Sequence, residues 1–288
     1  MEQQATIQTQ EDSAQTHGKR DYKCLFVVFV IGERYINNFN ILYRKSLEAY
    51  CKKYNYDLIV RETFISKNSE EMDKKKFFWE RLLIPNEYRN EGYDFVVSID
   101  SDIYISSNAP PLPLHELGYK IGAVNERKIM GTYEYRETIQ RRNEWKDVRG
   151  RDWYALSGDT VEYDDHINGG LVVYRPEYHA DIMMALYHKY IGEYKRFYQD
   201  DQSVLSHFLM ENDMVYWLDD RFNRVWFFWR EIFYPCWTEA ANEEGEPLVP
   251  DMLKMIYMKN YIDMNYFCHL TGGTDAELLL RLVRIEMG

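Results

Sequence analysis

The sequence has little cysteine and no long apolar run. Its four cysteines, Cys24, Cys51, Cys236 and Cys268, form no close pairs and no zinc-site spacing, which argues against a disulfide framework and favours a reduced compartment. No stretch approaches the roughly 18 apolar residues that span a bilayer. Residues 1–20 are polar and lack the apolar segment of a signal peptide. We therefore expect a soluble, cytoplasmic protein with no membrane span, or a chain from which a membrane anchor has been removed.

Positive charge is also scarce, since the formal net charge is −12. This balance argues against a general nucleic-acid binder, which needs a basic stripe. An anionic substrate would need a local cation, either a metal ion or a placed Lys or Arg. Aromatic residues reach 16%, which suits either a groove for sugars or bases, or ordinary packing.

The pattern of apolar residues predicts an α/β protein with a mostly parallel, Rossmann-like central sheet flanked by helices. Strands and helices alternate in the first third of the chain, and ligands of such sheets bind at the carboxyl ends of the strands. The expected strands cover residues 24–31, 56–60, 93–100, 120–125, 169–176 and 214–220. The expected helices cover residues 36–54, 77–90, 176–194 and 200–212.

Two segments fall outside this pattern. Residues 1–20 are predicted to be a disordered tail before a single domain over 21–288. Residues 126–166 are long, charged and without clear periodicity. They are interpreted either as a lid over an active site or as a plain surface insertion.

Asp100 and Asp102 stand at the end of the apolar strand in "FVVSIDSDIYIS". Alternation along a strand would point both carboxylates to the same side. A divalent cation would relieve their repulsion and still bind substrate phosphates. The alternative is a strand end that uses Asp only as a turn former.

Further motifs make the sequence resemble the nucleotide-sugar glycosyltransferases of the GT-A fold, most closely glycosyltransferase family 8. The resemblance spans roughly residues 22–275. Besides the Asp-x-Asp strand, it rests on these segments: "IGERY" (31–35), "INGGLVVYRPE" (167–177), "DDQSVLS" (200–206), "LDDRFN" (218–223) and "HLTGGTD" (269–275).

The resemblance implies a GT-A domain with a nucleotide-binding part over about 21–105 and an acceptor-binding part over about 106–275. It also implies three metal ligands, Asp100, Asp102 and His269. An imidazole beside two carboxylates favours Mn²⁺, with Mg²⁺ possible. The partners would be a nucleotide-sugar donor, most often UDP-linked in such enzymes, and a glycan acceptor.

The same resemblance assigns the remaining site residues. Those near the nucleotide and donor sugar would be Val30, Gly32, Tyr35, Arg81, Asp100, Ser101, Asn168, Gly169, Gly170 and Gly272. Those near the reacting carbon would be Asp200, Asp201 and Gln202. Tyr35 would stack on the base, with helix-start packing as the alternative. Gly169 and Gly170 would let the backbone approach the sugar, because a side chain would collide with the ligand, and the alternative is a turn with positive φ. Asp200 is expected also to cap the helix that follows.

The late loop departs from the family pattern. The family usually has a Lys shortly after the glycine that matches Gly272, whereas this chain continues with Gly273, Thr274 and Asp275. The phosphates would then depend on the metal, on backbone N–H groups, or on Arg81 or Lys76. Arg81 could equally form an exposed salt bridge. Thr274 with Glu277 also reads as a capping box.

The resemblance implies sugar transfer with retention by one of two routes: a covalent intermediate on Asp201, or attack on the leaving-group face. Three alternatives remain open: a sugar nucleotidyltransferase, a self-glycosylating enzyme, or an inactive glycan-binding relative. A cytoplasmic glycan-building enzyme of a bacterium or virus fits best. The sequence indicates neither the sugar, the acceptor, the linkage nor the oligomeric state.

Overall fold

The computed structural model of the chain describes residues 22–66, 74–129, 150–234, 237 and 249–287. The predicted tail over 1–20 and much of the candidate lid, residues 130–149, lie outside these ranges, as does Cys236. The division into a nucleotide-binding and an acceptor-binding part stays a prediction.

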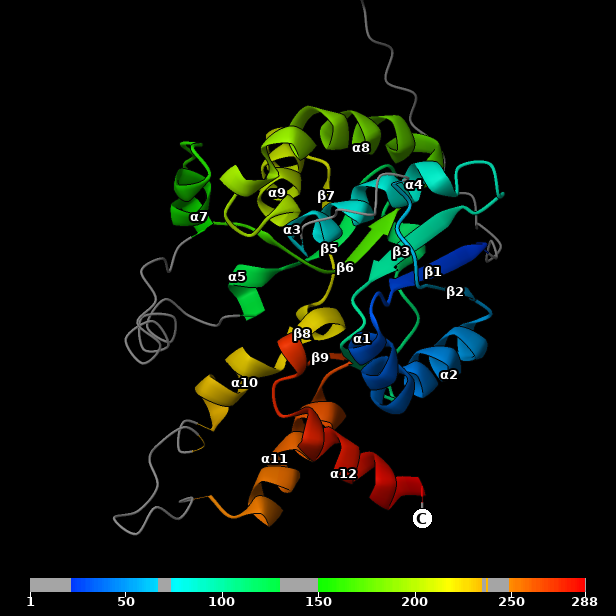
Figure 1. Cartoon of the computed structure of the whole chain (residues 1–288), viewed down its shortest axis with the longest axis vertical. Coiled ribbons are helices and arrows are strands. Elements are labelled where there is room, and N and C mark those ends of the chain that lie inside the picture. The colour runs from blue at the N-terminus through cyan, green and yellow to red at the C-terminus, as the bar shows by residue number, and fades with distance from the viewer. Residues whose placement is uncertain (1–21, 67–73, 130–149, 235–236, 238–248, 288) are drawn as a thin grey trace, which may run out of the picture.

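A six-stranded sheet forms the centre of the molecule, in the order β2-β1-β3-β6-β5-β7 (Figure 1). Only β6 runs antiparallel to its neighbours, so the predicted mostly parallel α/β sheet is confirmed. Both faces of β1 and β3 are buried, which explains their continuous apolar runs. In chain order the strands are β1 (Cys24–Phe29), β2 (Asp57–Arg61), β3 (Phe95–Ile99), β5 (Ile121–Asn125), β6 (Ile167–Tyr174) and β7 (Val215–Trp217).

Helices cover both faces of this sheet. The predicted helix over 36–54 is present as α1, a π-helical turn and α2. The one predicted over 77–90 is a run of α3, a 3₁₀ segment and α4. The helical segments of this first part are α1 (Glu33–Asn38), the π-helical turn Phe39–Tyr43, α2 (Arg44–Tyr54), α3 (Lys74–Phe77), the 3₁₀ segment Phe78–Leu83 and α4 (Ile84–Glu87).

The second part of the chain adds the remaining helices. The predicted helices over 176–194 and 200–212 are confirmed as α8 and α9, which pack above the sheet in the view of Figure 1. The helices are α5 (Glu126–Ile129), α7 (Gly150–Leu156), α8 (Pro176–Tyr190), α9 (Asp201–Glu211), α10 (Trp226–Phe233), α11 (Asp251–Met264) and α12 (Ala276–Met287). Short 3₁₀ segments lie at Leu114–Glu116, Ile191–Arg196, Asp220–Asn223 and Thr271–Gly273.

A small second sheet joins three segments that are far apart in the sequence. Its order is β4-β9-β8, with β4 at Ile103–Ile105, β8 at Arg224–Val225 and β9 at Phe267–His269. The register pairs Ile103 with His269. The third metal ligand implied by the family resemblance is therefore brought beside the Asp-x-Asp segment by strand pairing.

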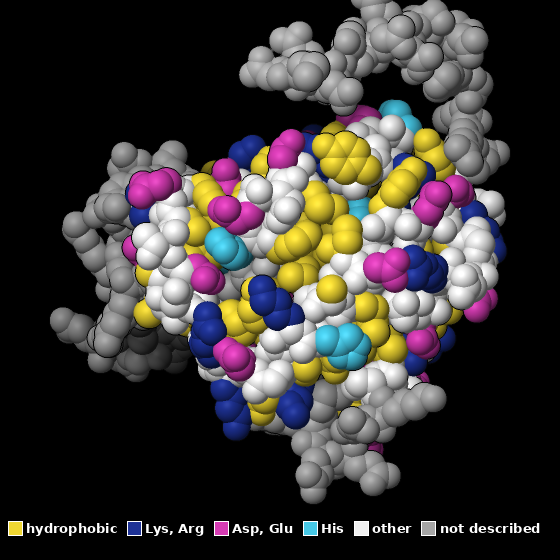
Figure 2. All heavy atoms as spheres, turned by 90° about the horizontal axis from the view of Figure 1, so that it is seen from above, with side chains coloured by type: hydrophobic (Ala, Val, Ile, Leu, Met, Phe, Trp, Pro, Cys, Tyr) yellow, Lys and Arg dark blue, Asp and Glu magenta, His cyan; other side chains and the backbone are white. Residues whose placement is uncertain are grey.

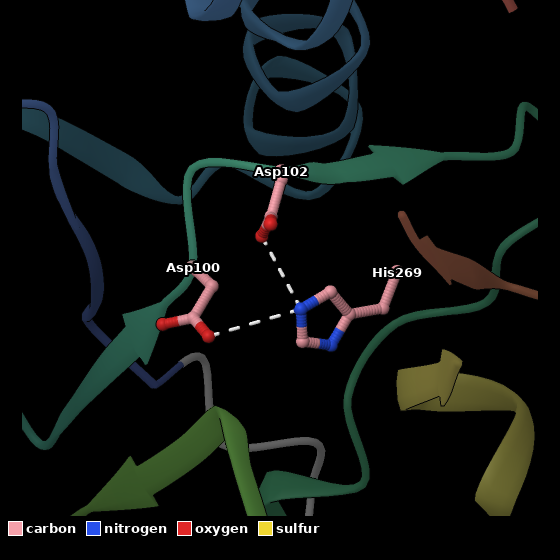
Figure 3. A group of neighbouring side chains, drawn as sticks. All are labelled: Asp100, Asp102 and His269. Carbon is pink, nitrogen blue, oxygen red and sulfur yellow. Dashed lines mark ion pairs between the residues drawn. The ribbon is translucent and has the colours of Figure 1, made fainter. Parts of the chain in front are cut away.

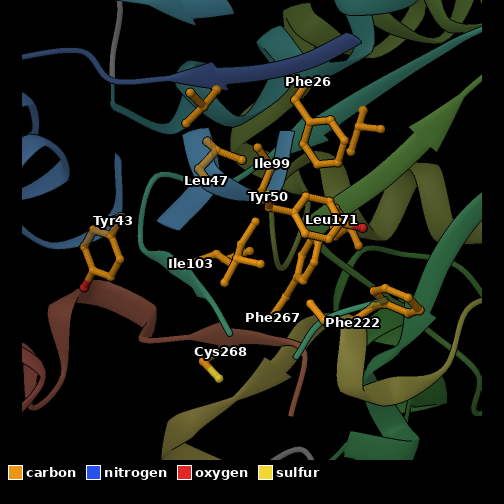
Figure 4. Close-up of a cluster of buried hydrophobic side chains, with 14 of the residues drawn as sticks. Phe26, Tyr43, Leu47, Tyr50, Ile99, Ile103, Leu171, Phe222, Phe267 and Cys268 are labelled. Carbon is orange, nitrogen blue, oxygen red and sulfur yellow. The ribbon is translucent and has the colours of Figure 1, made fainter. Parts of the chain in front are cut away.

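The main hydrophobic core lies between the two sheets and α2 (Figure 4). Phe26, Leu47 and Leu171 belong to it, and Phe267 enters it from the second sheet. Ile99 and Ile103, on either side of the Asp100–Asp102 segment, are 3% and 2% exposed. Burial of both neighbours fixes where the intervening acidic residues emerge from the core.

The face over α8 mixes hydrophobic, acidic and basic side chains without a continuous basic stripe (Figure 2). This mixture of signs on the face agrees with the net charge of −12. Within the described ranges, the helices all fall short of the length and apolarity that crossing a membrane requires.

Candidate functional site

Asp100 and Asp102 lie on a turn between β3 and β4, at the carboxyl end of β3. The expectation that both belong to one strand, with side chains on the same face by alternation, is wrong, because β3 ends at Ile99. Backbone bonds hold the turn instead: Asp100 N donates to Gly170 O at 2.9 Å, and Leu270 N donates to Asp102 O at 2.9 Å. The two carboxylates converge because the turn is fastened to β6 and to the residue after β9.

His269 points from β9 into the space between these carboxylates (Figure 3). Its Nε2 lies 3.2 Å from Asp102 Oδ1 and 3.8 Å from Asp100 Oδ2. The side chains of Asp100 and Asp102 are 33% and 26% exposed, so a ligand can reach them, whereas that of His269 is 5% exposed. Burial lowers the pKa of His269, but the nearby Asp102 and Asp100 outweigh it and raise that pKa.

This donor set fits a divalent cation. One ligand atom from each of the three residues lies within 4.8 Å of the others. Ligand atoms of an octahedral ion with bonds of about 2.1 Å lie about 3 Å apart, so small side-chain rotations suffice. Two carboxylates and an imidazole suit manganese better than calcium.

Arg81 is buried beneath the carboxyl end of the sheet. Its Nε lies 2.9 Å from Asp201 Oδ2, and its guanidinium lies 3.7 Å from Asp100 Oδ1. It also donates to the carbonyl oxygen of Gly169. The alternative that Arg81 forms an exposed salt bridge is wrong, because its residue is only 7% exposed. One guanidinium thus joins the candidate metal ligand Asp100 to Asp201.

Asp201 is the first residue of α9 and is 1% exposed. Burial raises the pKa of Asp201 to about 7, although Arg81 acts in the opposite direction. Asp200 precedes it with a φ of 53°, at the N-cap position. The predicted N-cap position is confirmed, but the Asp200 side chain accepts no capping hydrogen bond.

Gly169 and Gly170 are extended residues of β6, so the alternative of a turn with positive φ is wrong. A Cβ atom on Gly169 would lie 2.1 Å from a terminal nitrogen of Arg81. One on Gly170 would lie 2.6 Å from Cε1 of His269. The expectation from the resemblance was room for a ligand; in the structure these glycines make room for two side chains of the site.

Gln202 bridges β6 and the end of β5. Its Oε1 accepts from Gly169 N at 2.6 Å, and its Nε2 donates to Glu126 Oε2 at 2.8 Å. Sequence reasoning missed Glu126, which is 7% exposed and whose pKa burial raises to about 7. The sequence feature that could have identified Glu126 is its position as an acidic residue directly after an apolar strand.

Asn223 is a second residue that sequence reasoning missed, although it ends the "LDDRFN" motif. It is fully buried, and its Oδ1 lies 2.9 Å from His269 Nδ1. Its Nδ2 donates to Asn168 Oδ1 at 2.6 Å. Asn223 therefore links Asn168, which is predicted to lie near the donor sugar, to the candidate metal ligand His269.

Gly272 lies beside the metal cluster. Its N–H donates to Asp102 Oδ2 at 3.0 Å. Its φ is 67°, which glycine adopts without strain. The loop therefore already directs a backbone N–H at the predicted metal site.

The capping box predicted for Thr274 and Glu277 is wrong. Helix α12 begins at Ala276, and Thr274 Oγ1 donates instead to Thr271 O at 2.9 Å. Asp275 turns into the protein, where it accepts from Trp226 Nε1 at 2.7 Å and from Arg230 at 2.9 Å. These tertiary hydrogen bonds of Asp275 hold the residues before α12 in place of the predicted capping box.

The remaining predicted residues follow β1 or lie apart. Val30 is 1% exposed, so neither its side chain nor its backbone is accessible in this structure, whereas Tyr35 is 58% exposed. Gly32 has a φ of 97° and begins α1. Ser101 lies within the Asp100–Asp102 turn. Lys76, the other candidate phosphate ligand, lies 5.1 Å from the ring centroid of Tyr194.

Comparison with known proteins gives a result at the level of the fold. No protein-family model matches the chain, and no curated protein matches its sequence. A glycosyltransferase involved in glycosylation of the major capsid of PBCV-1 matches with a TM-score of 0.55 and 12% identity, over 92% of this chain and 100% of that one. The galactosyltransferase LgtC, solved with donor and acceptor sugar analogues, matches with a TM-score of 0.52 and 14% identity, over 91% and 95%. The chain has the GT-A fold of these structures.

Proposed function

We propose that the chain is a metal-dependent glycosyltransferase. It would move a hexose or pentose from a nucleoside-diphosphate sugar, UDP-linked by expectation, to a hydroxyl of a glycan acceptor with retention. The observation that carries this proposal is the convergence of Asp100, Asp102 and His269 at the carboxyl end of β3. The GT-A fold and the sugar analogues named for LgtC support the substrate class.

Asp100, Asp102 and His269 would hold the divalent ion, which supplies positive charge to the departing diphosphate. The N–H of Gly272 is already aimed at this position through its bond to Asp102. The same N–H can donate to a phosphate oxygen once Asp102 takes the ion. In the family pattern a Lys serves here; in this chain a backbone N–H group stands in its place.

Arg81 and Gln202 would hold the reacting end of the sugar in place. Arg81 fixes the Asp201 carboxylate and the Gly169 carbonyl, and Gln202 fixes the Gly169 N–H. Both backbone polar groups of Gly169 are therefore set by predicted site residues: Gln202, which the resemblance places near the reacting carbon, and Arg81, which it places near the nucleotide and donor sugar. A strand end held this way keeps its geometry while charge develops on the sugar, which is the preorganisation that transfer needs.

Two routes remain for the chemistry. In the first, Asp201 would attack the anomeric carbon as the bond from that carbon to the diphosphate oxygen breaks. The acceptor hydroxyl would then displace Asp201 and pass its proton to a phosphate oxygen. A pKa of about 7 leaves Asp201 a large ionised fraction at neutral pH. In the second, the acceptor hydroxyl attacks on the leaving-group face and passes its proton to a phosphate oxygen. An Asp201→Ala variant that keeps near-normal turnover would exclude the first route.

The test is donor binding and turnover with a panel of UDP- and GDP-sugars, each with and without Mn²⁺. A ligand that binds the folded state raises the melting temperature by mass action. We expect one nucleotide sugar to stabilise the protein and to be hydrolysed only with metal. Asp102→Ala should lose both effects, whereas Asp181→Ala, which removes an exposed carboxylate paired with Arg89, should lose neither.

The outcomes also separate the alternatives. Stabilisation by free glycans but by no nucleotide sugar would favour the inactive glycan-binding relative. Release of pyrophosphate from a nucleoside triphosphate and a sugar phosphate would favour the nucleotidyltransferase. A mass increase of the protein itself on incubation with donor would reveal self-glycosylation.

A further inference from the structure

A buried chain of hydrogen bonds connects the backbone of β6 to the imidazole of His269. Gly170 N donates to Asn168 Oδ1 at 2.9 Å, and Asn223 Nδ2 donates to the same oxygen at 2.6 Å. Asn223 Oδ1 then lies 2.9 Å from His269 Nδ1. Asn168, Asn223 and His269 are 7%, 0% and 4% exposed, so protein groups rather than bulk water satisfy these atoms.

The direction of every bond in this chain follows from its first member. A backbone N–H can only donate, so the Asn168 atom facing Gly170 must be the oxygen. Asn223 must then present its nitrogen to that oxygen and its own oxygen to His269. An amide oxygen only accepts, so the hydrogen of a neutral His269 ring must be on Nδ1. The lone pair of Nε2 is left facing Asp100 and Asp102.

A second contact demands the same orientation of Asn223. Its Nδ2 also lies 3.4 Å from the backbone carbonyl oxygen of Asn168, and a carbonyl oxygen can only accept. Flipping the Asn223 amide would therefore turn its oxygen toward two acceptors. Gly170 adds a steric condition, because a Cβ atom there would lie 2.6 Å from Cε1 of His269.

We propose that Asn223 is a positioning residue for the metal: it fixes the tautomer of His269 that leaves Nε2 free to bind a divalent ion, and it ties this tautomer to the end of β6. The inference rests on the proposed function for the presence of the ion. It goes beyond that function because it traces the tautomer of His269 to the backbone N–H of Gly170, which acts through the side chains of Asn168 and Asn223.

A purely structural role for Asn223 predicts different results. Removing any fully buried amide lowers stability, because its partners lose their bonds. Stability therefore does not distinguish the two roles. The tautomer of His269 and the affinity for Mn²⁺ do distinguish the two roles, because replacing an amide with a purely structural role would change neither.

Two substitutions separate the halves of the Asn223 side chain. Asn223→Asp keeps an oxygen that accepts from His269 Nδ1 but has no N–H for Asn168. Asn223→Leu has the same branching of side-chain heavy atoms and offers neither. We expect Asn223→Leu to populate the Nε2–H tautomer and to bind Mn²⁺ about tenfold to a hundredfold more weakly. Asn223→Asp should keep the Nδ1–H tautomer and bind within a few-fold of the original protein.

The measurement is ¹⁵N NMR of the histidine side chains in the metal-free protein, followed upward in pH until the His269 ring is neutral, because Asp102 and Asp100 raise its pKa. Mn²⁺ titration followed by electron paramagnetic resonance accompanies it. His269→Gln assigns the signal. His179 is an internal reference of the opposite tautomer, because its Nδ1 accepts from Arg175 N and its Nε2 donates to Tyr119 O.

The outcomes are distinguishable. An Nε2–H tautomer at His269 in the unsubstituted protein overturns the inference without any variant. So does an Asn223→Leu protein with an unchanged tautomer and unchanged Mn²⁺ affinity. If Asn223→Leu does not fold, the tautomer in the unsubstituted protein and in Asn223→Asp decides. If the unsubstituted protein binds no Mn²⁺ but shows Nδ1–H, the metal part of the proposed function fails while the assigned tautomer stands.

Discussion

Arg81 Nε lies 2.9 Å from Asp201 Oδ2, and both side chains are buried. Arg81 comes from the 3₁₀ segment before α4, and Asp201 is the first residue of α9, so the pair joins two helical segments that are far apart in the sequence. Its position beside Asp100 means that one ion pair serves both the packing of the fold and the candidate site.

We expect Arg81→Met to lower the free energy of unfolding by about 3–5 kcal/mol, because it leaves Asp201 buried without its cation. The double variant Arg81→Met/Asp201→Leu should recover part of this loss, since no buried charge remains. Urea denaturation at neutral pH measures both. The two residues would be shown not to interact if the double variant lost as much free energy of unfolding as Arg81→Met and Asp201→Leu lose together when made singly.

Alanine at the two strand glycines should act on two different partners. Gly169→Ala should displace Arg81, and Gly170→Ala should displace His269, each lowering stability by about 1–3 kcal/mol. Only Gly170→Ala is expected to weaken Mn²⁺ binding directly. Gly192→Ala is the matched control, because a Cβ atom there meets no atom within 4 Å. Equal Mn²⁺ affinity for Gly170→Ala and the unsubstituted protein would contradict the predicted displacement of His269.

The carboxyl of Glu126 should make stability depend on pH. Burial raises its pKa from 4.5 to about 7, so the folded state binds this proton more tightly than the unfolded state. The contribution is present below about pH 4.5 and is lost as pH rises to about 7, by at most about 3 kcal/mol. Glu126→Gln should flatten the curve between these values.

Burial raises the pKa of Asp201 as well, so part of the pH dependence of stability should remain in Glu126→Gln. Urea midpoints measured between about pH 4.5 and 7.5 give both curves. Identical slopes for the two proteins would mean that Glu126 is ionised with an ordinary pKa in the folded state.

Tyr43→Phe should stabilise the protein by about 1 kcal/mol. The Tyr43 hydroxyl is buried and has no hydrogen-bond partner in the described part of the chain, and such a group loses its hydration without compensation. Tyr54→Phe is the contrasting control, because the Tyr54 hydroxyl donates to Ala109 O at 2.7 Å. Thermal unfolding should shift upward for the first and downward for the second; a downward shift for both would indicate a partner for Tyr43.

Much of the fold could be predicted from local pattern. The apolar runs of β1 and β3 are buried on both faces, and a run of this composition and length has few other stable arrangements. The predicted helical regions are all present, although the segment around Arg81 contains 3₁₀ geometry that periodicity does not reveal. The error at Thr274 falls where tertiary hydrogen bonds, here those of Asp275, compete with a local cap.

By itself, the sequence determined the order of strands and helices and the presence of two acidic residues at a strand end, because these depend on neighbours a few positions away. The tertiary structure decided what the site residues do. Arg81 meets Gly169 across 88 positions, and His269 meets Asn223 across 46. A spacing pattern holds no information on such pairs. Only the packed fold sets which atom of a buried Arg, Asn or His faces which partner, and therefore which lone pair is left for a metal ion.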